Sequence, residues 1–265
     1  ETKDNSLQAN MKKAIRIFAK TPTALAAFFR ARKSKKIISP KKNLSFAENF
    51  FHMCFGKVPT KEMVKAFDVS LILYAEHSFN VSTFTARTIT SSLSDIHGAI
   101  TGAIASLKGP LHGGANEEVM HMMNKIKKPE KALKWINNAL DKKEVVMGFG
   151  HRVYKKGDSR VPTMEKYFRK VAKINKDKKY IKIYDIVKNV MIQRKNIHPN
   201  VDYPTGPTYH LMGFDTDFFT PIFVISRITG WSAHIMEQHA ANKLIRPLSK
   251  YSGEKHRYVM PINHR

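Results

Sequence analysis

The stretch TKEMVKAFDVSLILY, residues 60–74, carries its apolar side chains at three- and four-residue steps. This spacing places them on one face of a helix. The members of the series are Met63, Val64, Phe67, Leu71 and Tyr74. The same period recurs along most of the chain, whereas strand-like alternation is weak and confined to 144–149 and 258–262. The sequence therefore predicts an all-α fold.

Further helices are expected on the same grounds. Their predicted ranges are 82–108, 116–126, 129–140, 162–175, 180–197 and a last helix that begins at Thr220–Pro221. Proline at 129 and 162 is compatible with the first turn of a helix, where its missing N–H costs nothing. Small residues share the 82–108 helix and allow another helix to approach closely, which we expect from a partner subunit. These residues are Gly98, Ala99, Gly102 and Ala103.

The composition limits the class of protein. The chain has 265 residues, of which 42% are apolar, enough for one large domain or two small ones. No apolar run approaches the roughly 20 residues that cross a bilayer, so we expect a soluble protein without a membrane partner. The single cysteine, Cys54, stands among phenylalanines and is predicted to be a buried, inert thiol. A lone cysteine also excludes an internal disulfide and favours a cytoplasmic protein.

The formal net charge of +25 favours anionic partners. The basic excess is concentrated in residues 1–50 and 151–200 and consists mainly of lysine. Dispersed lysine is typical of a solvated surface, while attraction of anionic substrates and nucleic-acid binding stay open as alternatives. We expect no specific nucleic-acid partner.

Three polar clusters interrupt the helical pattern, at 109–116, 148–160 and 199–207. Each combines an ionisable residue, His112, His151 or Asp202, with glycines or prolines that restrict the backbone, as is typical of functional loops. Gly148-Phe149-Gly150 begins like a dinucleotide fingerprint, but position 153 is Val and no strand–helix alternation surrounds it. The histidines lack metal-ligand spacing, so no metal site is expected. A single such histidine is more often structural than catalytic.

Taken together and in order, these clusters resemble the citrate synthase family. The matching motifs are KGPLHGGANE at 108–117, GFGHRVY at 148–154, GDSR at 157–160, NVD at 200–202, SRITGW at 226–231 and IRPLS at 245–249. Within the family, NFFHMCFG at 49–56, GDSRVPTM at 157–164 and YPTGP at 203–207 are similar to the bacterial 2-methylcitrate synthase branch.

The resemblance implies a citrate synthase-like fold, with a large helical domain formed by 1–111 and 214–265 and a small domain formed by 112–213. It also implies condensation of acetyl-CoA or propionyl-CoA with oxaloacetate, two acyl substrates that one sequence does not rank. By resemblance Asp202 is the general base, His112 donates to the thioester oxygen and His151 donates to the oxaloacetate carbonyl. This division of labour couples proton abstraction with oxyanion stabilisation.

The resemblance assigns the substrate contacts as well. Arg160, Arg227 and Arg246 match the arginines that bind the oxaloacetate carboxylates, and His77 matches a further substrate histidine. Arg246 is expected to reach the site of a neighbouring subunit, which implies a homodimer. The backbone of the loop that meets the CoA adenine matches Val145, Val146, Met147, Gly148, Phe149 and Gly150. Lys155 and Lys156 follow as candidates for its phosphates, with a solvated role as the alternative; the CoA thioester is a substrate, and no tightly bound cofactor is expected.

Members of the family extend further at the N-terminus. Two expectations follow: the chain is a fragment of a longer product, or it is a shortened, catalytically inactive homologue that acts as a dimeric binding protein. Citryl-CoA cleavage on the same fold and a basic nucleic-acid module are further alternatives.

Overall fold

The computed structural model describes residues 3–151, 153–154 and 156–265. These residues form helices joined by loops, which confirms the all-α prediction. The α-helices are α1 (Leu7–Ala31), α2 (Phe46–Phe55), α3 (Lys61–Tyr74), α4 (Val81–Ser91), α5 (Ile96–Leu107), α6 (Ala115–Ile126), α7 (Pro129–Asp141), α8 (Val161–Ile174), α9 (Lys179–Lys195), α10 (Asp202–Leu211) and α11 (Phe219–Ala240). Short 3₁₀ helices are η1 (Thr216–Phe218) and η2 (Ile262–His264).

The two weak strand candidates are wrong. Within the described residues, 144–149 is mostly turn and irregular loop, with one isolated antiparallel bridge between Phe149 and Pro199, and 258–262 is irregular up to the start of η2. The alternation at 144–149 has a local cause: Val145 lies exposed at a cavity rim while Val146 is buried.

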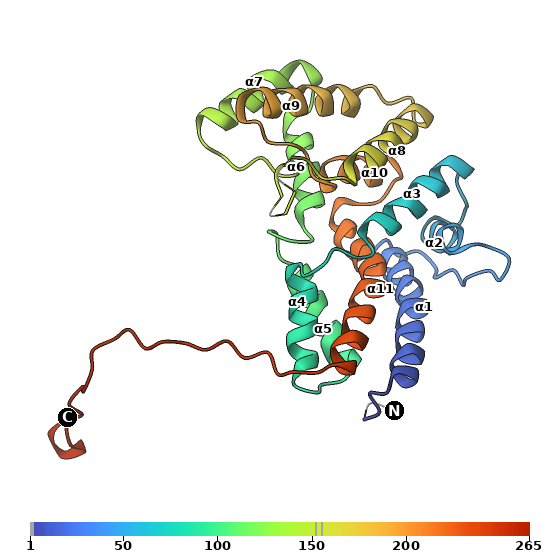
Figure 1. The fold of residues 1–265 in the computed structure, drawn as a ribbon. Coiled ribbons are helices and arrows are strands. Elements are labelled where there is room, and N and C mark those ends of the chain that lie inside the picture. The colour runs from blue at the N-terminus through green and yellow to red at the C-terminus, as the bar shows by residue number, and fades with distance from the viewer. Residues whose placement is uncertain (1–2, 152, 155) are drawn as a thin grey trace.

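The helices gather in two groups (Figure 1). Helices α6 to α10 lie together at one end, and α1, α4, α5 and α11 run side by side at the other. One apolar core runs from α2 and α3 into α6 to α10, while a second packs α4 and α5 against α11 around Trp231. After Ala240 the chain leaves this body as an extended tail. The domain boundaries at 112 and 213 stay a prediction.

The predicted 82–108 helix is two helices, which corrects the sequence expectation. Leu93 adopts a left-handed conformation with φ 66°, and the Asp95 carboxylate accepts hydrogen bonds from the backbone N–H groups of His97 and Gly98 at 2.7 and 3.1 Å. Such a side chain caps a new helix N-terminus. The chain therefore folds back, and a Cβ on Gly102 would lie 2.2 Å from Ile89 Cδ1. Gly102 therefore makes room for Ile89 of the same chain, and not for a helix of a partner subunit.

The third polar cluster is largely helical and not a loop. Helix α10 starts at Asp202 despite Pro204 and Pro207. Pro204 stands in the first turn, where no N–H is needed. Thr208 Oγ1 donates to the Pro204 carbonyl oxygen at 2.6 Å. Asp202 is thereby held at a helix start.

Helices α1 and α2 stand outside those expected from the sequence. Ser45 and Glu48 form a reciprocal capping box at the start of α2. Cys54 in this helix is buried, as predicted, and burial raises the pKa of its thiol to about 12. Among the described helices, none combines the length and apolarity needed to cross a membrane.

Candidate active site

A cavity of about 510 Å³ lies where the two groups of helices meet. Its walls come from segments far apart in sequence, and they bring together most of the predicted site residues: His77, His112, His151, Arg160, Asp202, Arg227 and the loop 145–150. Arg246 is exposed in the tail and does not line this cavity. Lys156 lines a different hollow, and Lys155 lies outside the described residues.

Asp202 stands at the N-terminus of α10 and faces Tyr74 at the end of α3. Tyr74 Oη donates to Asp202 Oδ1 at 2.5 Å. Burial raises the pKa of Asp202 to about 6, although the Tyr74 hydrogen bond and the charge of Arg160 oppose that rise. The carboxylate is therefore mostly ionised at pH 7 yet more basic than an ordinary aspartate. Such a group is suited to accept a proton.

Asn200 joins the loop 145–150 to the base. Its backbone N–H donates to the Gly148 carbonyl oxygen at 2.9 Å, and its Nδ2 donates to the Gly150 carbonyl oxygen at 3.0 Å. Its Oδ1 accepts from the Asp202 N–H at 3.0 Å. Gly148 and Gly150 have φ 85° and 77°, values that favour glycine. The loop and Asp202 are thus parts of one hydrogen-bonded unit.

His112 lies in the turn between α5 and α6. His112 Nε2 accepts from the backbone N–H of Ser82 at 3.3 Å and lies 2.8 Å from Ser82 Oγ; in the neutral tautomer in which Nε2 accepts, the ring proton is on Nδ1. Burial, followed by the charge of Arg227, lowers the pKa of His112 to about 4. The imidazole is therefore neutral at pH 7 and offers one hydrogen-bond donor.

His151 and His77 stack in the same cavity, with ring centroids 4.9 Å apart. His151 Nδ1 accepts from the backbone N–H groups of Val153 and Tyr154 at 3.0 and 3.2 Å, which places the proton of a neutral ring on Nε2. Burial, followed by Arg160, lowers the pKa of His77 to about 4. His77 Nε2 is buried and has no hydrogen-bond partner.

Two arginines give the cavity a positive wall. Asp158 holds Arg160 by hydrogen bonds from Nε at 3.0 Å and Nη2 at 2.7 Å, and it also accepts the Val201 N–H at 3.0 Å. Arg227 Nε donates to the Tyr74 carbonyl oxygen at 2.6 Å, while its buried Nη1 has no partner. Burial, followed by the charge of Arg160, lowers the pKa of Arg227 to about 10. Unpaired buried donors are costly, so this wall favours an anionic ligand.

The sequence did not single out four residues that support this site. Tyr74, Ser82, Asp158 and Asn200 each hold a predicted site residue or its loop. Asp158 and Asn200 stand inside quoted motifs, whereas Tyr74 had been placed among core residues by its helical spacing. No motif marked Ser82, because its partner His112 is 30 residues away.

The cavity thus offers one base, three histidines and two guanidinium groups. These can remove a weakly acidic proton and stabilise negative charge on two oxygen atoms. Groups of three metal-ligating side chains are absent from the described residues.

Comparison with known proteins gives a consistent picture. Residues 1–248 match the family model described as citrate synthase, C-terminal domain. The chain is 57% identical over 254 residues to 2-methylcitrate synthase 2 of Corynebacterium glutamicum, covering 94% of this chain and 66% of that protein. It is 53% identical to a citrate synthase of Mycolicibacterium smegmatis, covering 97% of this chain and 68% of that protein. A 2-methylcitrate synthase of Mycobacterium tuberculosis is also 53% identical, with 97% and 65% covered. The chain therefore spans about two thirds of the length of these relatives.

Solved structures agree. Citrate synthase from Thermoplasma acidophilum, in a ternary complex with carboxymethyl coenzyme A and oxaloacetate, superposes with a TM-score of 0.90 at 34% identity, covering 98% of this chain and 70% of that one. Citrate synthase from Thermotoga maritima gives a TM-score of 0.88 at 38% identity, covering 97% and 71%.

Proposed function

The chain belongs to the citrate synthase family, as its motifs predicted, and from this premise we propose that it condenses an acyl-CoA with oxaloacetate and releases coenzyme A. The observation that carries the proposal is the meeting of Asp202, His112 and His151 on one cavity, in which the buried atoms His77 Nε2 and Arg227 Nη1 lack hydrogen-bond partners. The chemistry of that set matches what the reaction needs.

In the proposed reaction, Asp202 takes a proton from the carbon next to the thioester. The Nδ1–H of His112 donates to the thioester oxygen as negative charge develops there. The resulting carbon nucleophile attacks the ketone carbon of oxaloacetate, whose oxygen accepts a hydrogen bond from His151 Nε2–H. The alkoxide formed at that oxygen takes up one proton, and Asp202 gives up the proton that it removed, so the protons balance. Water then cleaves the thioester and frees the CoA thiol. A donor of this kind contributes about 10²–10³-fold, and the base contributes about 10²–10⁴-fold.

Arg160 and Arg227 bind the two carboxylates of oxaloacetate in this proposal, and His77 supplies a further contact. The unpaired Nη1 of Arg227 supports it, because a bound carboxylate satisfies this donor without rearranging the wall; the carboxylate also satisfies Nε2 of His77 in the tautomer that carries its proton there. Asp158 keeps Arg160 in place and also fastens the backbone beside Asp202. Asp158 therefore positions both a substrate-binding arginine and the proposed base.

The loop 145–150 is proposed to meet the CoA adenine. Val145 lies exposed at the cavity rim, while the positive φ of Gly148 and Gly150 sets the course of the loop backbone along the cavity. Lys156 turns to another hollow, so its proposed phosphate contact is weakly supported. The identities of 51–57% to 2-methylcitrate synthases support propionyl-CoA as a substrate, and the citrate synthase relative at 53% supports acetyl-CoA.

We also propose a homodimer in which Arg246 completes the partner's site. Arg246 is exposed on the C-terminal tail, which extends away from the body of the protein. The start of the tail is fixed by two hydrogen bonds of 3.0 Å, from Asn242 Nδ2 to the Ser91 carbonyl oxygen and from Ile245 N–H to Ser91 Oγ. Phe84 and Ile104 on α4 and α5 are 48% and 40% exposed, which supports a covered face. Oxaloacetate is proposed to close the 112–213 part onto the rest. The single cysteine supports the expected cytoplasmic location.

The test of the shared site is to mix Asp202→Asn with Arg246→Ala and allow subunits to exchange. One site of each mixed dimer then carries neither change, so up to about half of the wild-type activity per dimer should return by symmetry. No recovery after verified exchange, or full activity in an isolated monomer, would overturn the shared site.

The test of the activity is a thiol-release assay with oxaloacetate and either propionyl-CoA or acetyl-CoA, with the product identified by mass spectrometry. We expect thiol release that depends on oxaloacetate and a tricarboxylic acid product. Binding of both substrates without thiol release would favour the inactive homologue, and consumption of citryl-CoA instead would favour the lyase.

A further inference from the structure

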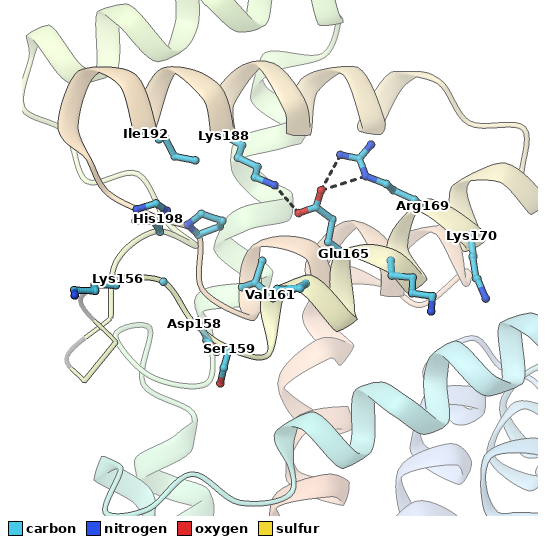
Figure 2. A pocket seen from close by; sticks show the side chains of 14 residues that line it. Lys156, Asp158, Ser159, Val161, Glu165, Arg169, Lys170, Lys188, Ile192 and His198 are labelled. Atoms are coloured by element: carbon cyan, nitrogen blue, oxygen red, sulfur yellow. Dashed lines mark hydrogen bonds and ion pairs between the residues drawn. The ribbon is translucent and has the colours of Figure 1, made fainter.

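A second hollow, of about 790 Å³, is lined by residues 156–159, which precede Arg160 of the active-site cavity in the chain (Figure 2). We call it the basic groove. Its walls are one face of α8, the C-terminal half of α9, and the segments 156–159 and 198–199. It shares no described lining residue with the active-site cavity. Residues 157–159 of the GDSR motif line part of it, but the proposed reaction places no substrate there.

The floor of the basic groove is an internally neutralised network. Glu165 accepts hydrogen bonds from Lys188 Nζ at 2.7 Å, from Arg169 Nη2 at 2.8 Å and from Tyr184 Oη at 2.9 Å. Arg169 also pairs with Asp185 at 2.5 Å. The 2.7 Å contact between Lys188 and Glu165 is also an ion pair. These two cations and two carboxylates offset one another and fix the shape of the floor.

Three further lysines line the groove, and no neighbouring carboxylate that the structure describes neutralises their charge. Lys166 and Lys170 stand one helical turn apart on α8, and Lys156 stands on the adjoining segment. All three are exposed, and no carboxylate of the described residues pairs with them. Asp158, the other acidic lining residue, is fully buried and occupied by Arg160. The groove therefore carries an excess of about three positive charges at a concave surface, which concentrates anions.

The groove also has an apolar end. In Figure 2, Ile192, His198 and Lys156 stand at one end of the hollow and Lys170 at the opposite end; Pro199 also lines the hollow. A flat ring can pack on an imidazole and an aliphatic side chain, and a phosphate chain can follow the lysines. An apolar end together with several cations suits a nucleotide better than a single small anion.

We propose that the basic groove binds a polyphosphate chain, with its phosphates against Lys166 and Lys170. The same chemistry is offered by a nucleoside triphosphate and by inorganic polyphosphate. This also assigns a role to part of the basic excess of residues 151–200, which the active site leaves unused. The proposal is independent of the condensation reaction.

The test is calorimetric titration of the protein with tripolyphosphate and, separately, with ATP, at low ionic strength and with the active site saturated with CoA. We compare wild type, Lys166→Ala/Lys170→Ala, and the matched control Lys173→Ala/Lys176→Ala. The control removes the same charge from exposed positions of α8 and the turn after it that do not line the groove. We expect saturable binding in wild type, at least about tenfold weaker binding in the first double variant and less than about twofold change in the control.

Comparison of ATP with tripolyphosphate shows whether the groove binds a nucleotide or only a chain of phosphates. ATP binding tighter than tripolyphosphate, with the difference lost in His198→Ala, assigns the groove to a nucleotide. Equal affinities assign it to the phosphate chain alone. Absence of saturable binding by either ligand, or equal weakening in both double variants, would overturn the proposal. All variants change exposed or half-buried side chains, and unchanged thermal melting verifies their fold.

Discussion

The active-site cavity and the basic groove are lined by consecutive parts of the chain around residues 156–160, yet they use charge in opposite ways. In the cavity, ionisable groups from distant segments are partly or fully buried, and two polar atoms, His77 Nε2 and Arg227 Nη1, have no partner. In the groove, the half-buried charges are paired with one another and the remaining lysines face solvent. Charge alone therefore does not identify the chemical site.

The difference lies in burial and in the state of the groups. Burial raises the pKa of Asp202 to about 6 and lowers that of His112 to about 4, which yields a base and a neutral donor at pH 7. In the groove, burial is outweighed by hydrogen bonds from Lys188 and Arg169, so the pKa of Glu165 falls below its ordinary value. The charged groups of the cavity remain available for chemistry, whereas those of the network in the groove stabilise its shape.

The largest effect is expected from Asp202→Asn. The amide keeps the shape of the carboxylate but cannot accept the proton, so turnover should fall about 10³-fold. Oxaloacetate affinity should change by only a few-fold. Steady-state thiol release and calorimetry measure the two quantities, with Asp68→Asn on the exposed face of α3 as the control. Near-normal turnover in Asp202→Asn would remove this residue from the role of base.

The same variant should be more stable than wild type above pH 6. The pKa of Asp202 is higher in the folded state than in an unfolded chain, so the folded state loses stability as pH rises from about 4 through 6. By linkage this loss is about 3 kcal/mol at pH 7. Asparagine does not titrate, so denaturant unfolding at pH 7.5 should favour the variant, and the difference should vanish near pH 4. A less stable variant at pH 7.5 would contradict the assigned cost of burying this charge.

A smaller, pH-dependent effect is expected from Tyr74→Phe. The tyrosine hydrogen bond stabilises the charged carboxylate, so its loss should raise the pKa of Asp202 further, by about one unit. Turnover should then fall roughly twofold near pH 7 and roughly fivefold near pH 6, and recover toward pH 9. Measuring kcat at these pH values separates this from simple misfolding. An equal loss at all of them would show that Tyr74 does not tune the base.

The smallest effect is expected from Lys166→Ala/Lys170→Ala on condensation itself. These lysines line the groove and touch none of the active-site residues in a hydrogen bond or ion pair among the described contacts. We expect kcat and KM for oxaloacetate within about twofold of wild type, since surface charges away from a site have small effects. A large change in either constant would show that the two regions are coupled.

Sequence alone predicted the helical class and most of the cavity residues, because apolar periodicity and motif order are local. It did not predict the break at Leu93, where a left-handed residue and the Asp95 cap override an apolar pattern that continues through both helices. It placed Asp202 in a loop, because prolines at 204 and 207 mask the start of α10. These errors come from interactions that a linear pattern does not contain.

The sequence did not reveal the residues that position the site, because their contacts join segments far apart in the chain. Tyr74 meets Asp202 across 128 positions, and its spacing on α3 is that of any core residue. The perturbed pKa of Asp202 depends on burial by several elements at once, which no motif encodes. The basic groove likewise becomes visible only when α8 and α9 are placed side by side.

The central claim is that burial converts Asp202 into a base that titrates near neutrality. The most direct measurement is the pH dependence of kcat/KM for oxaloacetate-dependent thiol release between pH 4.5 and 8.5, with circular dichroism verifying the fold at each pH. We predict that the rate rises with pH and reaches half its maximum near pH 6, where the carboxylate becomes ionised. A rate already at its plateau at pH 5, as for an ordinary aspartate, would contradict the account.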